Sequence, residues 1–227
     1  MTGRSIKARP FDFPYDGRLD PATAALIVID LQVDFLSPGG YLARKGYDPA
    51  PLRAILPAVN RVIEAARAVG CLVVFTRQGY LADLSDMTEY ERWRRRRAGL
   101  EGTTALLRGS PGFELVPEIE VRAGDLVADK TAESAFADTG LEQTLRARGI
   151  VHLLIAGCTT EVCVHSTLRD ASDRNFQCLL IEDACASGDP AMHAAAVAMV
   201  TVEDGVFGVV ASSEAVIAAL HPATARS

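Results

Sequence analysis

Residues 150–169 read IVHLLIAGCTTEVCVHSTLR, and this stretch decides the fold that we expect. The run Val151–Ala156 is apolar apart from His152, which is typical of a buried strand in a parallel sheet. The chain then turns at Gly157 and resumes with helical spacing from Glu161. This unit places the thiol of Cys163 near a helix N-terminus, where backbone N–H groups and the helix dipole stabilise an anion. Cys163 is therefore a candidate nucleophile, and a small buried packing residue is the alternative.

The rest of the chain alternates short apolar runs with helical patterns. We expect five further strands, at residues 25–29, 71–76, 125–129, 177–181 and 206–210. Helices are expected at residues 51–69, 141–148, 161–174, 191–201 and 213–220. This alternation predicts a three-layer, doubly wound α/β fold of the Rossmann-like kind, with a mostly parallel six-stranded sheet and helices on both faces.

The pattern also predicts how the chain is divided. Residues 1–24 are rich in Pro, Gly and aromatic residues and are expected to form an N-terminal arm, followed by a single domain at 25–227. Residues 77–124 form a long connection, with short helical pieces expected near 88–97 and 112–117. A connection of this length is usually functional, so we expect either a lid or a subunit contact.

Composition narrows the function classes. Of the 227 residues, 49% are apolar and 23% are charged, which suits a chain with a sizeable core. The net charge of −6 argues against nucleic acid as a partner, and the basic run Arg94–Arg97 is interpreted as a solvated helix face, with a lid or a subunit contact as alternatives. The five cysteines lack paired zinc spacing. No apolar stretch reaches the roughly 18 residues of a membrane span, so we expect a cytoplasmic protein without membrane partners.

Three reactive residues follow predicted strands. Asp30 ends the first strand, Lys130 follows the third, and Cys163 comes just after the fourth. Because the carboxyl ends of parallel strands lie at one edge of a sheet, these residues are expected to meet there. An ammonium lowers the pKa of a thiol, and a carboxylate can take the thiol proton and return it to a leaving amine. The turn at 158–161 offers backbone N–H groups to an oxyanion.

The chain resembles the isochorismatase-like cysteine hydrolase superfamily along nearly its full length. The matching stretches are ALIVIDLQVDF (25–35), DKTAESAF (129–136), AGCTTEVCVHSTLRDA (156–171), IEDACAS (181–187) and GVFG (205–208). The resemblance implies a catalytic triad of Asp30, Lys130 and Cys163. It also implies a cis peptide bond at Cys158–Thr159, which would direct the N–H of Thr159, together with that of Cys163, at the oxyanion.

Within this superfamily, FPYDG (13–17), PGGYLARKGYD (38–48), ERW (91–93) and GVFG are most similar to biuret hydrolase and its triuret-hydrolysing relatives. Nicotinamidases carry a metal-binding Asp-x-His and further histidines after the first loop. None of the four histidines here lies in that region, so we expect no metal and no cofactor.

The resemblance also implies substrate-binding residues. Phe35 matches a position that walls the pocket, and Thr159 and Thr160 belong to its polar wall. Glu203 stands where biuret hydrolases carry a glutamine that binds the far end of the substrate. Because an ionised glutamate only accepts hydrogen bonds, Glu203 favours a substrate with a free terminal –NH2, such as triuret. The alternative is that Glu203 turns away to solvent or pairs with an arginine.

The sequence thus predicts an amidohydrolase that cleaves a terminal C–N bond of triuret or biuret. Cys163 attacks the carbonyl, Asp30 moves the proton to the leaving ammonia, and water then hydrolyses the thioester. The resemblance implies a homo-oligomer, either a dimer or a tetramer. The alternative is a ureidoacrylate or N-carbamoyl-amine amidohydrolase, although Glu203 in the wall would repel a substrate carboxylate. A non-enzymatic nucleotide- or flavin-binding domain is disfavoured because no G-x-G-x-x-G follows the first strand.

Overall fold

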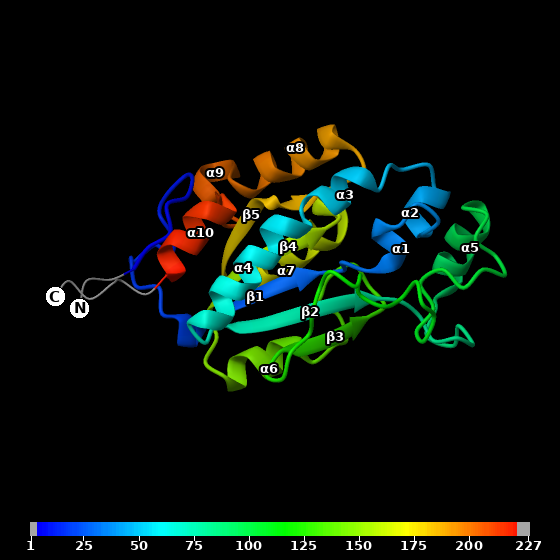
Figure 1. The fold of residues 1–227 in the computed structure, drawn as a ribbon, viewed down its shortest axis with the longest axis horizontal. Helices are drawn as coiled ribbons and strands as arrows, with labels where there is room; N and C mark the ends of the chain where they lie inside the picture. Colours follow the sequence, from blue (N-terminus) through cyan, green and yellow to red (C-terminus); the bar gives the residue numbers. More distant parts are fainter. Residues whose placement is uncertain (1–3, 222–227) are drawn as a thin grey trace.

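The computed structural model describes residues 4–221, and the two ends of the predicted arm and domain, 1–3 and 222–227, lie outside the described residues. A six-stranded parallel sheet forms the centre, with strand order β3-β2-β1-β4-β5-β6 (Figure 1). The predicted doubly wound α/β fold is therefore confirmed. The strands are β1 (Ala24–Ile29), β2 (Leu72–Gln78), β3 (Leu126–Lys130), β4 (His152–Cys158), β5 (Gln177–Ala186) and β6 (Val209–Ala211).

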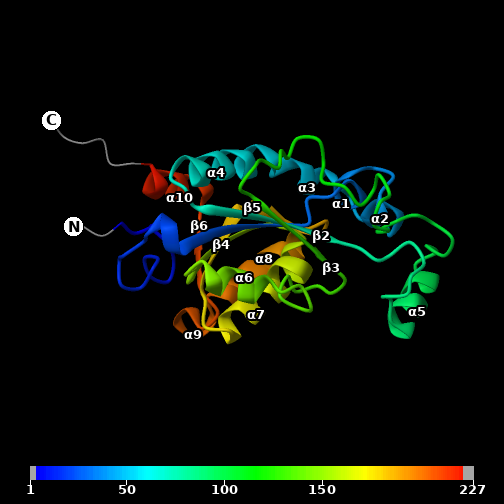
Figure 2. The same cartoon turned by 90° about the horizontal axis from the view of Figure 1, so that it is seen from below.

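Helices cover both faces of the sheet, as the view in Figure 2 shows. On one face lie α3 (Ala50–Ala54), α4 (Leu56–Ala68) and α10 (Ser213–Leu220). On the other face lie α6 (Leu141–Ala147), α7 (His165–Asp173), α8 (Pro190–Val200) and α9 (Val202–Gly205). The remaining helices, α1 (Val33–Leu36), α2 (Tyr41–Arg44) and α5 (Glu89–Arg97), lie beyond the carboxyl ends of the strands.

The alternation of side chains along β1 divides the core in two. Leu26 and Val28 pack into the core beneath α4 and α10, whereas Ala25, Ile27 and Ile29 pack into the core beneath α6 and α7. Every residue of β1 is fully buried because both faces of the central strand are covered. Among residues 4–221, no helix has the length and apolar character needed to cross a membrane.

Some expected elements differ from the structure. The single helix expected at 51–69 is two helices, α3 and α4, because Pro57 has no N–H to donate to the carbonyl of Arg53 and the chain breaks at Ile55. Residues 112–117 form turns instead of a helix. Their carbonyls at Gly112 and Glu114 accept the first N–H groups of the α1 region, at 2.8 and 2.9 Å.

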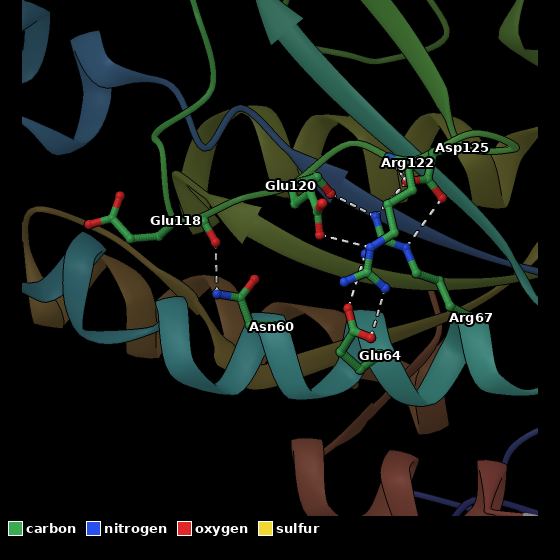
Figure 3. A network of polar contacts seen from close by, with 7 residues as sticks. All are labelled: Asn60, Glu64, Arg67, Glu118, Glu120, Arg122 and Asp125. Atoms are coloured by element: carbon green, nitrogen blue, oxygen red, sulfur yellow. Dashed lines mark hydrogen bonds and ion pairs between the residues drawn. The ribbon is translucent and has the colours of Figure 1, made fainter.

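Two neighbouring segments support the sheet from outside. In the described part of the predicted arm, Ile6 pairs with Phe13 and Arg9 pairs with Val210, so the arm covers the β6 edge. The connection that enters β3 is fixed to α4 by a network of ion pairs, with Arg67 Nη2 2.5 Å from the carboxylate of Asp125 (Figure 3). The same network contains Asn60, Glu64, Glu118, Glu120 and Arg122.

We predict that Gly157→Ala destabilises the sheet at the junction of β1 and β4. Gly157 has φ of +120°, and a Cβ there would lie 2.1 Å from the carbonyl oxygen of Ile29. The strain and the steric overlap should lower the free energy of unfolding by roughly 3 kcal/mol or more. Chemical denaturation measures this loss. The control Gly39→Ala, where a Cβ meets open space, should stay within about 0.5 kcal/mol of the parent; equal effects of the two substitutions would contradict the prediction.

Candidate active site

Asp30 lies directly after β1 and is held in an unusual backbone conformation. Its φ is +51°, in the left-handed region that residues other than glycine seldom adopt. The hydroxyl of Thr76 donates to Oδ1 of Asp30 at 2.6 Å, and the N–H of Asp30 donates to the carbonyl of Thr76 at 3.2 Å. Strained residues of this kind persist only where the surroundings fix them, and they cluster at functional sites. The Asp30 carboxylate is therefore fixed in position by β2.

Lys130, the last residue of β3, meets Asp30 across β2. Its Nζ lies 2.7 Å from Oδ2 of Asp30, and both side chains are fully buried. The same ammonium donates to the carbonyl of Ala132 at 3.0 Å and to Oε1 of Gln78 at 3.3 Å. Burial alone would lower the pKa of Lys130, but Asp30 and the sulfur of Cys163 raise it above its ordinary value. Lys130 is therefore a permanent buried cation.

Cys163 lies in a π-helical turn, Thr160–Val164, that leads into α7. The N–H of Val164 donates to the carbonyl of Thr159 at 3.2 Å, which is the spacing of a π-turn. The thiol is 4% exposed and donates to Oε1 of Gln78 at 3.0 Å. Lys130 and Asp30 both lie close enough to affect the titration of Cys163. The structure thus brings together the three residues that sequence reasoning proposed as a triad.

Gln78 is a site residue that sequence reasoning missed. It ends β2, pairs in register with Lys130, and accepts from both Lys130 and Cys163. Gln32 fixes its backbone, accepting from the N–H of Gln78 at 2.7 Å and donating to its carbonyl at 3.0 Å. The sequence contained a signal for Gln78, because a polar residue at the carboxyl end of a central strand lies at the same edge of the sheet as Asp30. The expected strand ended at residue 76, two residues too early to show it.

The electrostatics of the thiol differ from the expectation. Burial raises the pKa of Cys163 far above its ordinary value of 9.0; Lys130 opposes this rise and Asp30 adds to it. The resting group at neutral pH is therefore the protonated thiol, not a stored thiolate. A base must remove the proton during the reaction, and the Asp30 carboxylate is the buried base beside it.

The turn before Cys163 contains the other residues that the resemblance singled out. The peptide bond between Cys158 and Thr159 is cis, and Thr159 lines the cavity beside Cys163. Cys158 is fully buried and its thiol donates to the carbonyl of Asp30 at 3.2 Å. Thr160 is also fully buried, but its hydroxyl bonds to Nδ1 of His193 at 2.9 Å and it does not line the cavity. The expected substrate contact by Thr160 is therefore corrected to a structural role.

A cavity of about 570 Å³ opens above Cys163. Phe35, 5% exposed, lines it as expected. Its outer wall comes from α2 and α5 and from residues close to them. α5 lies in the connection 77–124, for which a lid was one of the two expectations, whereas α2 was not expected in the pocket. The aromatic and basic residues of this wall are Tyr41, Lys45, Tyr47, Tyr80, Tyr90, Trp93, Arg94, Arg95 and Arg97. The run Arg94–Arg97 is thus only partly a solvated face.

Glu203 is not brought to this cavity. It is exposed, has φ of +50°, and lies on α9 at the opposite end of the sheet from α1 and α2 (Figure 1). The physical reason is the topology: α8 runs back from the carboxyl ends of the strands, so the residues just before β6 lie at the amino edge. The substrate-binding role expected for Glu203 is therefore corrected. Its expected repulsion of a substrate carboxylate loses its basis as well.

The parallel sheet and the site at its carboxyl edge define the class of protein. It is an α/β protein in which a thiol, a carboxylate and an ammonium are buried close together. The Isochorismatase domain model matches residues 24–215. The chain therefore belongs to the isochorismatase family. Within residues 4–221, no group of three or more His, Cys, Asp or Glu side chains is placed to hold a metal ion.

Individual relatives and structures agree with this assignment. The chain is 36% identical to the ureidoacrylate amidohydrolase RutB of Klebsiella variicola (strain At-22), over 98% of this chain and 96% of that protein. Its structure is similar to that of N-carbamoylsarcosine amidase from Thermoplasma acidophilum, with a TM-score of 0.67, 29% identity, and coverage of 85% and 97%. A cysteine hydrolase from Pseudomonas syringae pv. phaseolicola 1448A shares the fold, with a TM-score of 0.79, 24% identity, and coverage of 97% and 98%.

We predict opposite changes in thiol reactivity for the two charged neighbours of Cys163. Asp30 raises the pKa of the thiol and Lys130 lowers it. Asp30→Asn should therefore increase the fraction of thiolate at pH 8, and Lys130→Met should decrease it. One unit of thiol pKa is a roughly tenfold change in thiolate. The measurement is the rate of Cys163 alkylation by iodoacetamide, read from the modified peptide by mass spectrometry.

The pH profile of the parent protein provides the control. Because the pKa of Cys163 is raised above 9.0, the parent alkylation rate should still be rising at pH 9. Circular dichroism checks that each variant is folded. A plateau of the parent rate near neutral pH, or a pH profile of folded Asp30→Asn that is shifted to higher pH than the parent profile, would refute this description of the thiol.

Proposed function

We propose that this protein is a cysteine-dependent amidohydrolase that cleaves a C–N bond of a small ureido compound bearing a carboxylate, of the ureidoacrylate type. The observation that carries the proposal is the position of the Cys163 thiol, which lines a cavity and shares the acceptor Oε1 of Gln78 with Lys130, the buried partner of Asp30. This arrangement supplies a nucleophile, a base and a fixed cation. The substrates named for the relatives, ureidoacrylate and N-carbamoylsarcosine, both carry a ureido group and a carboxylate.

The chemistry follows from the protonated thiol. As Sγ of Cys163 attacks the ureido carbonyl carbon, its proton passes to Asp30. The N–H groups of Thr159 and Cys163 are the proposed donors to the resulting oxyanion. Asp30 then protonates the leaving nitrogen, the C–N bond breaks, and a thiocarbamate, which is the thioester of a carbamic acid, remains on Cys163. Water attacks its carbonyl carbon and gives one proton to Asp30. As the C–S bond breaks, Asp30 returns this proton to Sγ of Cys163 and the carbamic acid leaves.

Lys130 holds Asp30 in place. Burying a charged group is costly unless a partner of opposite charge lies close to it. The Lys130 ammonium, 2.7 Å from Oδ2 of Asp30, is that partner. Gln78 accepts from both Lys130 and the thiol, so it orients the sulfur relative to the base.

The outer wall of the cavity supports an acidic substrate. Lys45 donates to the hydroxyl of Tyr41 at 3.3 Å and lies over its ring, and Arg97 lies over the ring of Trp93 at 5.1 Å. Neither cation forms an ion pair with a carboxylate anywhere in residues 4–221, whereas Arg94 is paired with Glu91 at 2.7 Å. Two cations without anionic partners at the cavity mouth are suited to a substrate carboxylate. Biuret and triuret, which are neutral, gain nothing from them.

A substrate panel tests the proposal. Ureidoacrylate and its saturated analogue N-carbamoyl-β-alanine should be hydrolysed with a higher kcat/KM than biuret or triuret, as measured by ammonia release. Lys45→Met and Arg97→Met should each raise KM for the ureido acids by roughly threefold to tenfold, because an exposed charge contact contributes about 1 kcal/mol, and should leave the neutral substrates unaffected. Higher turnover of biuret or triuret than of every ureido acid would overturn this choice of substrate.

The nucleophile has its own test. Cys163→Ala should lower kcat by roughly a thousandfold or more, since no other group can form the thioester. Cys185→Ala removes another buried thiol, in β5, that does not line the cavity, and is the matched control, with activity close to that of the parent. Turnover by folded Cys163→Ala at the parent rate would refute the mechanism.

A further inference from the structure

Glu161 is a carboxylate that neither the fold nor the proposed mechanism uses. It lies in the same π-helical turn as Cys163, two residues before it, and lines the same cavity. Its side chain accepts no hydrogen bond and forms no ion pair with any of the residues 4–221, and Oε2 is buried. The other two carboxylates of the cavity, Glu91 and Glu133, lie 2.7 and 3.8 Å from the guanidinium of Arg94.

A buried carboxylate oxygen without a donor is costly. Leaving such an atom unsatisfied destabilises the protein, and native proteins rarely keep one without a reason. The cost is recovered if a ligand brings the missing N–H donors. Because Glu161 faces the cavity that contains Cys163, that ligand is the molecule on which Cys163 acts.

His193, a titratable neighbour of Glu161, does not supply the missing donor or a positive charge. His193 lies close enough for Glu182 and Glu161 to raise its pKa. Burial nevertheless lowers the pKa of His193 below 6.5, so its imidazole is neutral at pH 7. Its Nδ1 is already bonded to the hydroxyl of Thr160 at 2.9 Å. Glu161 therefore has no cation beside it.

We propose that the Glu161 carboxylate is the acceptor for the N–H groups of the substrate's ureido group, and so selects ureido compounds over simple amides. The inference rests on the proposed function. A ureido group presents a carbonyl oxygen on one side and N–H donors on the other, so an oxyanion donor at Thr159 and an acceptor at Glu161 would bind its two sides. An acetamide has a methyl group in place of the terminal –NH2 and offers Glu161 one donor fewer.

Isosteric ligands give a direct test. N-carbamoyl-β-alanine and N-acetyl-β-alanine differ only by –NH2 in place of –CH3. In the parent enzyme the first is measured as a substrate, and the second as a competitive inhibitor through its inhibition constant. Glu161→Ala should lower kcat/KM for the ureido acid roughly tenfold to a hundredfold, mainly through KM, as expected for a lost charge-assisted hydrogen bond. The inhibition constant of the acetyl compound should change by less than about threefold.

Two further variants make the result specific. Glu161→Gln keeps the shape and one acceptor, so its loss should be smaller than that of Glu161→Ala. Glu182→Gln removes a carboxylate that also acts on His193 but is bonded to Arg9 at 2.9 and 2.5 Å and does not line the cavity, so the parent kinetics should be kept.

The outcomes separate the two proposals. If the parent hydrolyses ureido acids and Glu161→Ala weakens both ligands equally, or neither, the role of Glu161 is overturned and the proposed function stands. If the parent hydrolyses no ureido compound, the proposed function is overturned and the role of Glu161 with it.

Discussion

The buried ion pair between Asp30 and Lys130 is the constraint on which the site depends. The two residues come from β1 and β3, which are separated in the sheet by β2, so the pair forms only if all three strands end at matching heights. Desolvating two charges is expensive, and the contact between them must be close to offset that cost. Thr76 and Gln78, both from the intervening strand, provide further hydrogen bonds to the pair. The register of the sheet therefore determines whether the ion pair of the active site can form.

The same pair determines how the thiol is used. A thiol beside an ammonium alone would be stored as thiolate, but here burial and Asp30 keep Cys163 protonated. Proton transfer is therefore tied to nucleophilic attack, and the carboxylate that receives the proton lies where it can pass it to the leaving nitrogen. The polar residues around the reacting sulfur come from the ends of three strands and from one turn. The helices on the two faces of the sheet contribute none of them.

Sequence reasoning predicted the parts of this protein that depend on local pattern and on topology. The apolar runs gave the sheet, and the rule that parallel strands end at one edge placed Asp30, Lys130 and Cys163 together. Sequence reasoning failed where contacts with distant segments determine the structure or the position of a residue. Residues 112–117 were expected to be helical, but their carbonyls are used by the start of α1. Glu203 was assigned to the pocket by resemblance, although its position just before β6 puts it at the far edge of the sheet.

The helix α5 supplies much of the cavity wall and yet has no buried residue of its own. It is held by side chains that reach neighbouring backbone, as where Arg95 donates to the carbonyls of Thr103 and Ala105 at 2.6 and 2.8 Å. A segment without core contacts opens at a far smaller free energy than the sheet beneath it. Amide hydrogens in α5 therefore exchange with solvent long before those of β1 and β4. The protein combines a reaction centre of high local stability with a cavity wall of low local stability, and access to the thiol can change without any change in the ion pair.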